Sequence, residues 1–108
     1  MYIYNITTNI EGSHEQKWLD WMQNTHIPEM LATGKFSSAK LCKVLIEEEM
    51  GGVTYSVQYG VESLEILKEF HETEAPILKN KANSLFAGHF VYFETELQLM
   101  DKQFSAVN

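Results

Sequence analysis

The stretch WLDWMQNTHIPEMLATGKF, residues 18–36, decides the fold because it holds an aromatic helix and the segment that leads out of it. At about 100° per residue, four apolar side chains fall on one arc of this helix: Trp18, Leu19, Trp21 and Met22. The polar residues of the same segment lie largely outside that arc. We therefore expect the two tryptophans to face a hydrophobic core.

A proline is expected to end this first helix. The residue before a proline is pushed away from helical dihedral angles, so Ile27 predicts a helix end near Thr25 or His26. Pro28 suits the first turn of a short second helix, and Gly34 stands where a left-handed residue would end it. The stretch thus predicts two helices with a break between them.

The residues before this stretch predict a strand and a helix start. Residues 2–10 mix aromatic and β-branched side chains, which favour a strand over a helix. Ser13, followed by Gln16 three residues later, has the form of a capping box that begins the first helix. The residues after the stretch predict a hairpin, with strands at 36–49 and 53–59 and a turn at Gly51-Gly52.

The second half of the chain adds another helix and strand. Ser63 can cap a helix over residues 64–86 that restarts with a kink at Thr73-Glu-Ala-Pro76, and residues 89–100 return to a strand. The element order is βαββαβ, and such units form an antiparallel sheet with both helices on one face. We therefore expect a ferredoxin-like α+β fold.

Apolar side chains on both faces of the predicted sheet indicate a homodimer. In the first strand Tyr2, Tyr4 and Ile6 fall on one face and Ile3 falls on the other. Two helices cover one face only, so a second copy of the chain is the most economical cover for the other. The alternative is a twisted sheet whose second face carries scattered apolar residues.

Composition excludes several classes of partner. The 108 residues carry a formal net charge of -7, which argues against binding to nucleic acid or to an anionic membrane surface. Cys42 has no second cysteine to pair with, and the N-terminus lacks the features of a signal peptide, so a cytoplasmic protein is expected. We expect a single domain over residues 1–100 and a C-terminal tail over residues 101–108.

Three segments resemble a family of short bacterial proteins catalogued as a domain of unknown function: HIPEMLATGKF at 26–36, VLIEEEMGGVTYSVQY at 44–59 and EAP at 74–76. The resemblance covers nearly the whole chain. Wider relatives are the dimeric α+β barrel proteins, which include antibiotic-biosynthesis monooxygenases, muconolactone isomerases and heme-degrading monooxygenases. The resemblance implies two ferredoxin-like protomers joined sheet to sheet as a barrel, with a ligand pocket between each sheet and its helices. It implies no particular reaction.

The resemblance also suggests site residues. Heme-degrading relatives use an Asn on the first strand with a Trp and a His of the later helix. Asn5 and His71 match two of these, but the helix over residues 64–86 has no Trp. Cofactor-free monooxygenases position their substrate with polar groups in an apolar pocket, which Asn5, Tyr59 and Trp21 could supply.

Five residues make up the candidate ligand-binding pocket: Asn5, Trp21, His26, Tyr59 and His71. His26 lies on the apolar arc if the first helix reaches it, where its imidazole could titrate or donate a hydrogen bond. The alternative is that His26 caps the end of the helix. No glycine-rich phosphate loop is present, and the four histidines lack the close spacing of metal ligands, so we expect no cofactor and no metal.

Three functions remain open at this stage. The absence of a convergent acid, base or nucleophile set favours a non-catalytic small-molecule binding or accessory protein. The second is a cofactor-free monooxygenase or isomerase that acts on a small aromatic or hydrophobic substrate. The third is a purely structural dimer, in which the core between helices and sheet is fully packed.

Overall fold

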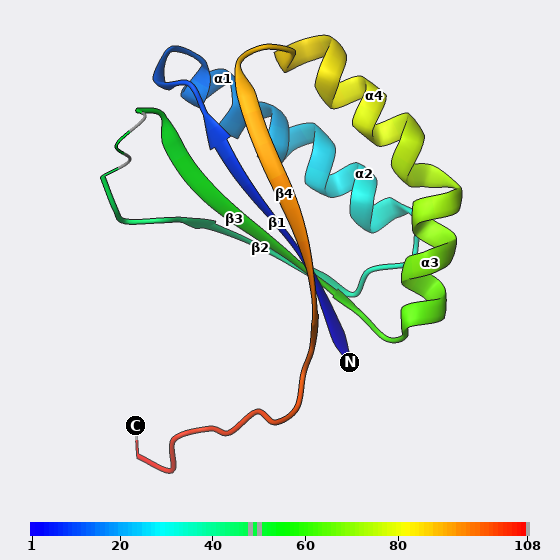
Figure 1. Cartoon of the computed structure of the whole chain (residues 1–108). Coiled ribbons are helices and arrows are strands. Elements are labelled where there is room, and N and C mark those ends of the chain that lie inside the picture. The colour runs from blue at the N-terminus through cyan, green and yellow to red at the C-terminus, as the bar shows by residue number, and fades with distance from the viewer. Residues whose placement is uncertain (48, 50, 108) are drawn as a thin grey trace.

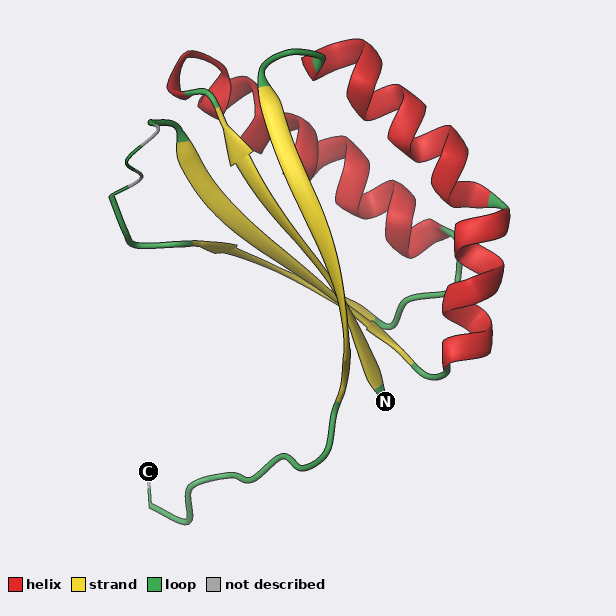
Figure 2. Ribbon diagram, viewed as in Figure 1, coloured by secondary structure: helices red, strands yellow, loops and turns green. Residues whose placement is uncertain are grey.

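In the computed structural model, which describes residues 1–47, 49 and 51–107, helices cover one face of a single sheet (Figure 1). The strands are β1 (Tyr2–Ile10), β2 (Ser38–Lys43), β3 (Val53–Val61) and β4 (Phe90–Gln98). The helical segments are the 3-10 turn η1 (Gly12–His14), α1 (Glu15–Trp21), the π-helical segment η2 (Met22–His26), α2 (Ile27–Ala32), α3 (Leu64–Glu72) and α4 (Glu74–Phe86). Figure 2 shows these helices as one layer and the strands as the other.

The sheet has the strand order β2-β3-β1-β4, and all neighbouring strands are antiparallel. β1 lies between β3 and β4, so Tyr4 is opposite Tyr59 on one side and Glu96 on the other. This order, with the helices on one face, confirms the ferredoxin-like α+β fold expected from the βαββαβ pattern.

The predicted break at Pro28 is wrong, because α1, η2 and α2 form one continuous helical run. Ile27 keeps helical dihedral angles, with φ -61° and ψ -46°, although it precedes the proline. The π-helical turn just before it gives the physical reason, since its wider hydrogen-bond spacing accommodates the proline ring and the missing N–H. Pro28 does lie in the first turn of α2, and Gly34, with φ 75°, follows the helix as expected.

The predicted capping box does not form either. No side chain caps the start of α1; Ser13 Oγ lies 2.9 Å from His14 Nδ1, and Gln16 Nε2 donates to Asp20 Oδ1 at 3.0 Å. The 3-10 turn explains this difference, because the backbone N–H of His14 donates to the carbonyl oxygen of Glu11 at 2.9 Å. A backbone turn therefore leads into the helix where a side-chain cap was expected.

The β2–β3 hairpin is present, but its first strand is shorter than predicted. β2 ends at Lys43, and the backbone N–H of Val44 makes one more hydrogen bond to the Thr54 carbonyl oxygen, at 2.9 Å. The sequence that follows is rich in glutamate, which has low strand propensity. Gly51 and Gly52 have positive φ but end a longer loop, of which residues 48 and 50 lie outside the described part.

The later helices follow the prediction. Ser63 Oγ accepts a hydrogen bond from the backbone N–H of Ile66 at 3.2 Å and so caps α3. α4 begins at Glu74 after a break at Thr73, and Pro76 lies in its first turn, where a missing N–H costs no helical hydrogen bond. In the described residues, no helix is both long enough and apolar enough to cross a membrane.

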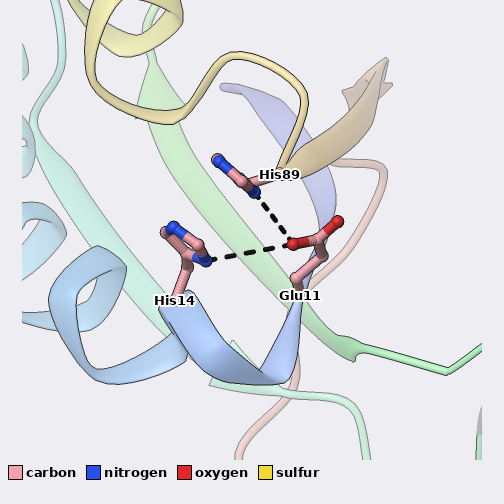
Figure 3. Close-up of side chains that lie close together, drawn as sticks. All are labelled: Glu11, His14 and His89. Carbon is pink, nitrogen blue, oxygen red and sulfur yellow. Dashed lines mark hydrogen bonds and ion pairs between the residues drawn. The ribbon is translucent and has the colours of Figure 1, made fainter.

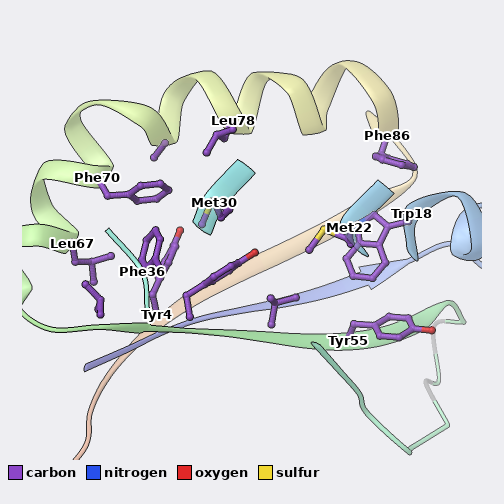
Figure 4. Close-up of a cluster of buried hydrophobic side chains, with 14 of the residues drawn as sticks. Tyr4, Trp18, Met22, Met30, Phe36, Tyr55, Leu67, Phe70, Leu78 and Phe86 are labelled. Carbon is purple, nitrogen blue, oxygen red and sulfur yellow. The ribbon is translucent and has the colours of Figure 1, made fainter. Parts of the chain in front are cut away.

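The hydrophobic core fills the space between the two layers (Figure 4). Side chains alternate along a strand, so alternate residues of β1 and β3 face the helices and supply the sheet's share of the core: Tyr4, Ile10, Tyr55, Val57, Tyr59 and Val61. The helices supply Trp18, Met22, Met30, Leu67, Phe70, Ala75, Leu78 and Phe86. Burying a large apolar side chain stabilises a fold by roughly 1.5 to 3 kcal/mol.

Among the described residues, no helix covers the other face of the sheet. At its β4 edge, Val91, Phe93 and Leu97 are 70%, 62% and 41% exposed. Residues 99–107, which follow β4, have no helix or strand, and Figure 1 shows them leaving the sheet beside the N-terminus and running away from the helices. This tail carries further exposed apolar side chains, among them Met100 and Phe104.

Candidate functional site

A cavity of about 70 Å³ lies between the sheet and the helices, and we call it the helix–sheet cavity. It is not fully enclosed, and its wall is mostly apolar. Its apolar lining includes Trp18, Trp21, Met22, Met30, Phe70 and Leu78 from the helices and Ile6, Val57 and Phe90 from the strands. Its polar lining includes His26, Tyr59, Thr8, Lys79 and Glu94. The helix layer is therefore not fully packed against the sheet.

The π-helical segment places Trp21 and His26 on the same side of the helical run. In an α-helix, residues five apart point about 140° away from each other. In η2 the N–H of Ile27 bonds to the carbonyl oxygen of Met22, five residues back, so the turn is wider than an α-helical turn and brings such a pair closer to one side. The imidazole of His26 accordingly stacks on the indole of Trp21, with ring centroids 4.6 Å apart.

His26 is a partly buried, neutral imidazole. Burial lowers its pKa to about 4, because the charged form loses its hydration. Its Nδ1 atom is buried and has no hydrogen-bond partner in the protein. An unpaired buried polar atom costs on the order of 1 to 3 kcal/mol, so a ligand that gave this nitrogen a hydrogen-bond partner would recover part of that cost.

Tyr59 supplies the second unpaired polar atom. It lies on β3 in the middle of the sheet, is fully buried, and its hydroxyl has no hydrogen-bond partner. Burial raises its pKa, so the hydroxyl keeps its proton at neutral pH. In the part of the chain that the structure describes, two buried side-chain polar atoms have no hydrogen-bond partner: His26 Nδ1 and the Tyr59 hydroxyl. Both residues line the helix–sheet cavity.

A charged pair lies at another part of the cavity wall. The Tyr4 hydroxyl donates to Glu94 Oε1 at 2.5 Å, and Lys79 Nζ lies 2.9 Å from the same oxygen. Burial alone would raise the pKa of Glu94, but these hydrogen bonds and the charge of Lys79 hold it below its usual value. Sequence reasoning missed this group, although Glu94 follows Phe90 and Tyr92 on the same face of β4.

The structure brings together three of the five predicted pocket residues: Trp21, His26 and Tyr59. Asn5 lies on the opposite face of the sheet, because it is adjacent to Tyr4 on β1, and its Oδ1 accepts a hydrogen bond from the Ser56 hydroxyl at 2.6 Å. His71 lies outside the cavity lining, and its Nε2 is 3.2 Å from Glu96 Oε2 near the surface.

Comparison with known proteins identifies a family and a fold. Residues 1–100 match the family model described as "Domain of unknown function (DUF4286)". The search of curated proteins found no match.

Solved structures with the same fold cover nearly the whole chain. A dimeric ferredoxin-like protein from an uncultured marine organism is 14% identical with a TM-score of 0.67, and the match covers 97% of this chain and 100% of that one. A second dimeric ferredoxin-like protein from an uncultured marine organism is 9% identical with a TM-score of 0.63, over 94% and 97% of the two chains. An ethyl tert-butyl ether D (EthD) family protein from Bacillus halodurans is 13% identical with a TM-score of 0.60, over 88% and 97%. At these identities the likeness establishes the fold alone.

Proposed function

The chain belongs to the family described as a domain of unknown function, DUF4286, and we propose that it is a homodimeric protein that binds a small, largely apolar molecule in the helix–sheet cavity. One observation carries this proposal. In the described residues, the two buried side-chain polar atoms without a partner, His26 Nδ1 and the Tyr59 hydroxyl, belong to residues that line the same apolar cavity. Apolar walls with a few unpaired polar groups are the usual design of a small-molecule site.

The cavity chemistry restricts the ligand. A volume of about 70 Å³ holds roughly five water-sized groups, so the bound part of the ligand is small. Trp21 and the apolar lining favour a ligand whose bound part is flat or hydrophobic. A hydroxyl or carbonyl oxygen on that ligand can accept a hydrogen bond from Tyr59, and a hydroxyl can also form a hydrogen bond with His26. Phenol carries such a hydroxyl on a flat ring and is a suitable probe, but its seven non-hydrogen atoms exceed a volume of about 70 Å³, so its ring must extend into the open side of the cavity.

The same polar groups favour binding over proton transfer. A general acid or base works best when its pKa lies near the working pH. Burial moves the pKa of His26 down to about 4 and moves the pKa of Tyr59 up, so both side chains are neutral and reluctant to exchange a proton near neutral pH. A neutral hydrogen-bonding pair suits recognition. The cofactor-free monooxygenase or isomerase is the alternative that an activity measurement must exclude.

The uncovered face of the sheet supports the homodimer. Val91, Phe93 and Leu97 expose an apolar edge there, and the tail adds Met100 and Phe104 beyond the end of β4. Solvent-exposed apolar groups in such a patch gain free energy when a second copy covers them. Two of the similar structures are described as dimeric, which agrees with a second copy as the occupant. Because a two-fold interface uses the same patch on both chains, each copy would cover the other's edge.

Titration of the ¹⁵N-labelled full chain with phenol, followed by NMR, tests the binding proposal. We expect saturable shifts of the Trp21 indole N–H and of the backbone amides around His26 and Tyr59. Toluene, which has the same ring without the hydroxyl, serves as the matched ligand and should bind more weakly because it leaves both polar atoms unpaired. Shifts confined to the surface, or no saturation up to the solubility of phenol, would overturn the proposal.

An oxygen electrode distinguishes binding from turnover. The protein incubated with phenol and other hydroxylated aromatics in air should consume no oxygen and leave the aromatic unchanged by chromatography. Oxygen uptake that depends on the protein, together with a new product, would overturn the non-catalytic reading in favour of the monooxygenase. An isomerised product without oxygen uptake would instead identify an isomerase.

A further inference from the structure

Three side chains with metal-binding atoms meet at one end of the sheet, away from the residues on which the proposed function rests. Glu11 follows β1, His14 ends η1, and His89 precedes β4 (Figure 3). Their ligand atoms all lie within 4.8 Å of one another. Glu11 Oε2 lies 2.9 Å from His89 Nδ1 and 3.9 Å from His14 Nδ1. His89, which is 75 or more positions away in the sequence, thus joins Glu11 and His14 in one cluster, which we call the Glu11–His14–His89 cluster.

Backbone contacts hold the cluster in place. The N–H of Glu11 donates to the carbonyl oxygen of His89 at 2.9 Å, which joins the two chain segments. The N–H of His14 donates to the Glu11 carbonyl oxygen at 2.9 Å within the 3-10 turn. Gly88 directs the chain into His89. Its φ of 82° would be strained in a residue that has a side chain. Because these backbone segments are already fixed, only side-chain rotations have to be ordered when an ion binds.

The two imidazoles lie against each other, with ring centroids 3.8 Å apart and planes inclined by 16°. Figure 3 shows a ring nitrogen of each histidine directed toward the same carboxylate. All three side chains reach solvent, so an ion can enter without opening the core. The chain's net charge of -7 also raises the local concentration of cations.

We propose that this cluster binds a divalent transition-metal ion such as Zn²⁺. Two imidazole nitrogens and one carboxylate oxygen are the donor set that such ions accept. Two ligand atoms on one tetrahedral zinc ion, each about 2.1 Å from the metal, are about 3.4 Å apart. The distances from the Glu11 oxygen to the two histidine nitrogens, 2.9 Å and 3.9 Å, lie on either side of this value. The two stacked rings must turn about their side-chain bonds so that both nitrogen lone pairs point at the ion, which their exposure to solvent permits, and a fourth coordination position remains open to water or an exogenous ligand.

Close spacing along the chain identifies metal ligands within one helix or hairpin, but it does not detect residues that the fold brings together from distant segments. Glu11 and His14 are three residues apart on a turn, whereas His89 arrives from the other end of the chain through the pairing of β1 with β4. The proposal is independent of the ligand in the helix–sheet cavity.

Isothermal titration calorimetry of the untagged, chelator-treated full chain with Zn²⁺ tests it. We expect saturation at one ion per chain, and His14→Ala and His89→Ala should each weaken binding by at least about tenfold. His71→Ala is the matched control, because His71 is also partly exposed and also pairs with a glutamate, but has no second imidazole beside it. This control should bind zinc as the wild type does.

A spectroscopic readout separates coordination from a change in folding. In ¹⁵N NMR spectra of the histidine side chains, Zn²⁺ should shift the ring nitrogens of His14 and His89 and leave those of His26 and His71 unmoved. Circular dichroism of each variant in the absence of metal confirms that it is folded. Absence of saturable binding to the wild type would overturn the proposal. Binding that persists in the His14→Ala, His89→Ala double variant would also overturn it, because the ion would then be adventitious.

Discussion

The imidazole of His26 stacks on the indole of Trp21, with ring centroids 4.6 Å apart and an angle of 21° between the ring planes. A π-helical turn makes this contact, since it puts residues five positions apart on one side of the helix. The contact removes the imidazole from water and directs it to the helix–sheet cavity. A helix irregularity and a candidate ligand group therefore have the same structural origin.

Burial of His26 predicts a loss of stability in mild acid. The pKa of His26 is about 4 in the folded protein and about 6.5 in the unfolded chain. Between these values the unfolded state binds a proton that the folded state does not, so stability is complete above about pH 6.5 and falls as the pH drops toward 4. The loss reaches about 2 to 3 kcal/mol.

Urea unfolding at about pH 7 and about pH 4.5 measures this loss, and His26→Phe is the variant that isolates it. Phenylalanine keeps a ring against Trp21 but cannot bind a proton. The drop in unfolding free energy between the two pH values should be smaller in the variant by about 2 kcal/mol. Equal drops in the two proteins would show that His26 does not titrate as a buried group.

We expect the same Tyr→Phe substitution to change the free energy of unfolding differently at two tyrosines of β3. Tyr59→Phe removes a buried hydroxyl without a partner and should leave the free energy of unfolding unchanged or raise it by up to about 1 kcal/mol. Tyr55→Phe removes a hydroxyl that donates to Glu15 and should lower it by about 1.5 kcal/mol. Both are measured by urea unfolding at neutral pH. A destabilised Tyr59→Phe variant would indicate that its hydroxyl is already satisfied.

The homodimer is tested by a charge on the uncovered face of the sheet. Phe93→Lys should convert a dimer of about 25 kDa, twice the 12.5 kDa chain, into a monomer in sedimentation velocity at micromolar concentration. Ile77→Lys is the control, because Ile77 on α4 is 61% exposed and Phe93 is 62% exposed, but Ile77 lies in the helix layer. Wild-type sedimentation as a monomer would rule out the proposed assembly.

Two serines test the assignment of helix caps. Ser63→Ala removes the hydroxyl that accepts from the Ile66 N–H and should destabilise the protein by about 1 kcal/mol. Ser13→Ala, at the start of the first helix, removes a hydroxyl that makes no cap and should cost less than about 0.5 kcal/mol. Thermal unfolding of the two variants gives the comparison, and equal losses would contradict it.

The sequence was sufficient for the fold because local signals agree with one another. The aromatic and β-branched residues of β1, the cap at Ser63 and the glycine at position 34 each act over a few residues, where propensity and turn chemistry are informative. The same locality explains the errors. The proline rule for Ile27 takes no account of a π-helical turn, and the capping pattern at Ser13 takes no account of a 3-10 turn that replaces it.

The candidate site was only partly accessible from the sequence. Trp21 and His26 belong to one segment, and Tyr59 lies on the helix-facing side of β3. The spacing of apolar residues in these elements therefore indicates that all three side chains face the core. Placing Asn5 from the sequence required the correct assignment of sheet face, because a shift of one residue along a strand moves a side chain to the other face. The pairing of Glu94 with Tyr4 and the meeting of Glu11 with His89 depend on strand register across the whole chain, which no local pattern contains.

A crystal structure of the full chain grown with saturating phenol tests the central claim most directly. The account predicts one phenol in the helix–sheet cavity, its ring against Trp21 and its oxygen within hydrogen-bond distance of the Tyr59 hydroxyl or His26 Nδ1. Phenol bound only at the surface, or a cavity that closes around its own side chains with both polar atoms paired within the protein, would contradict it.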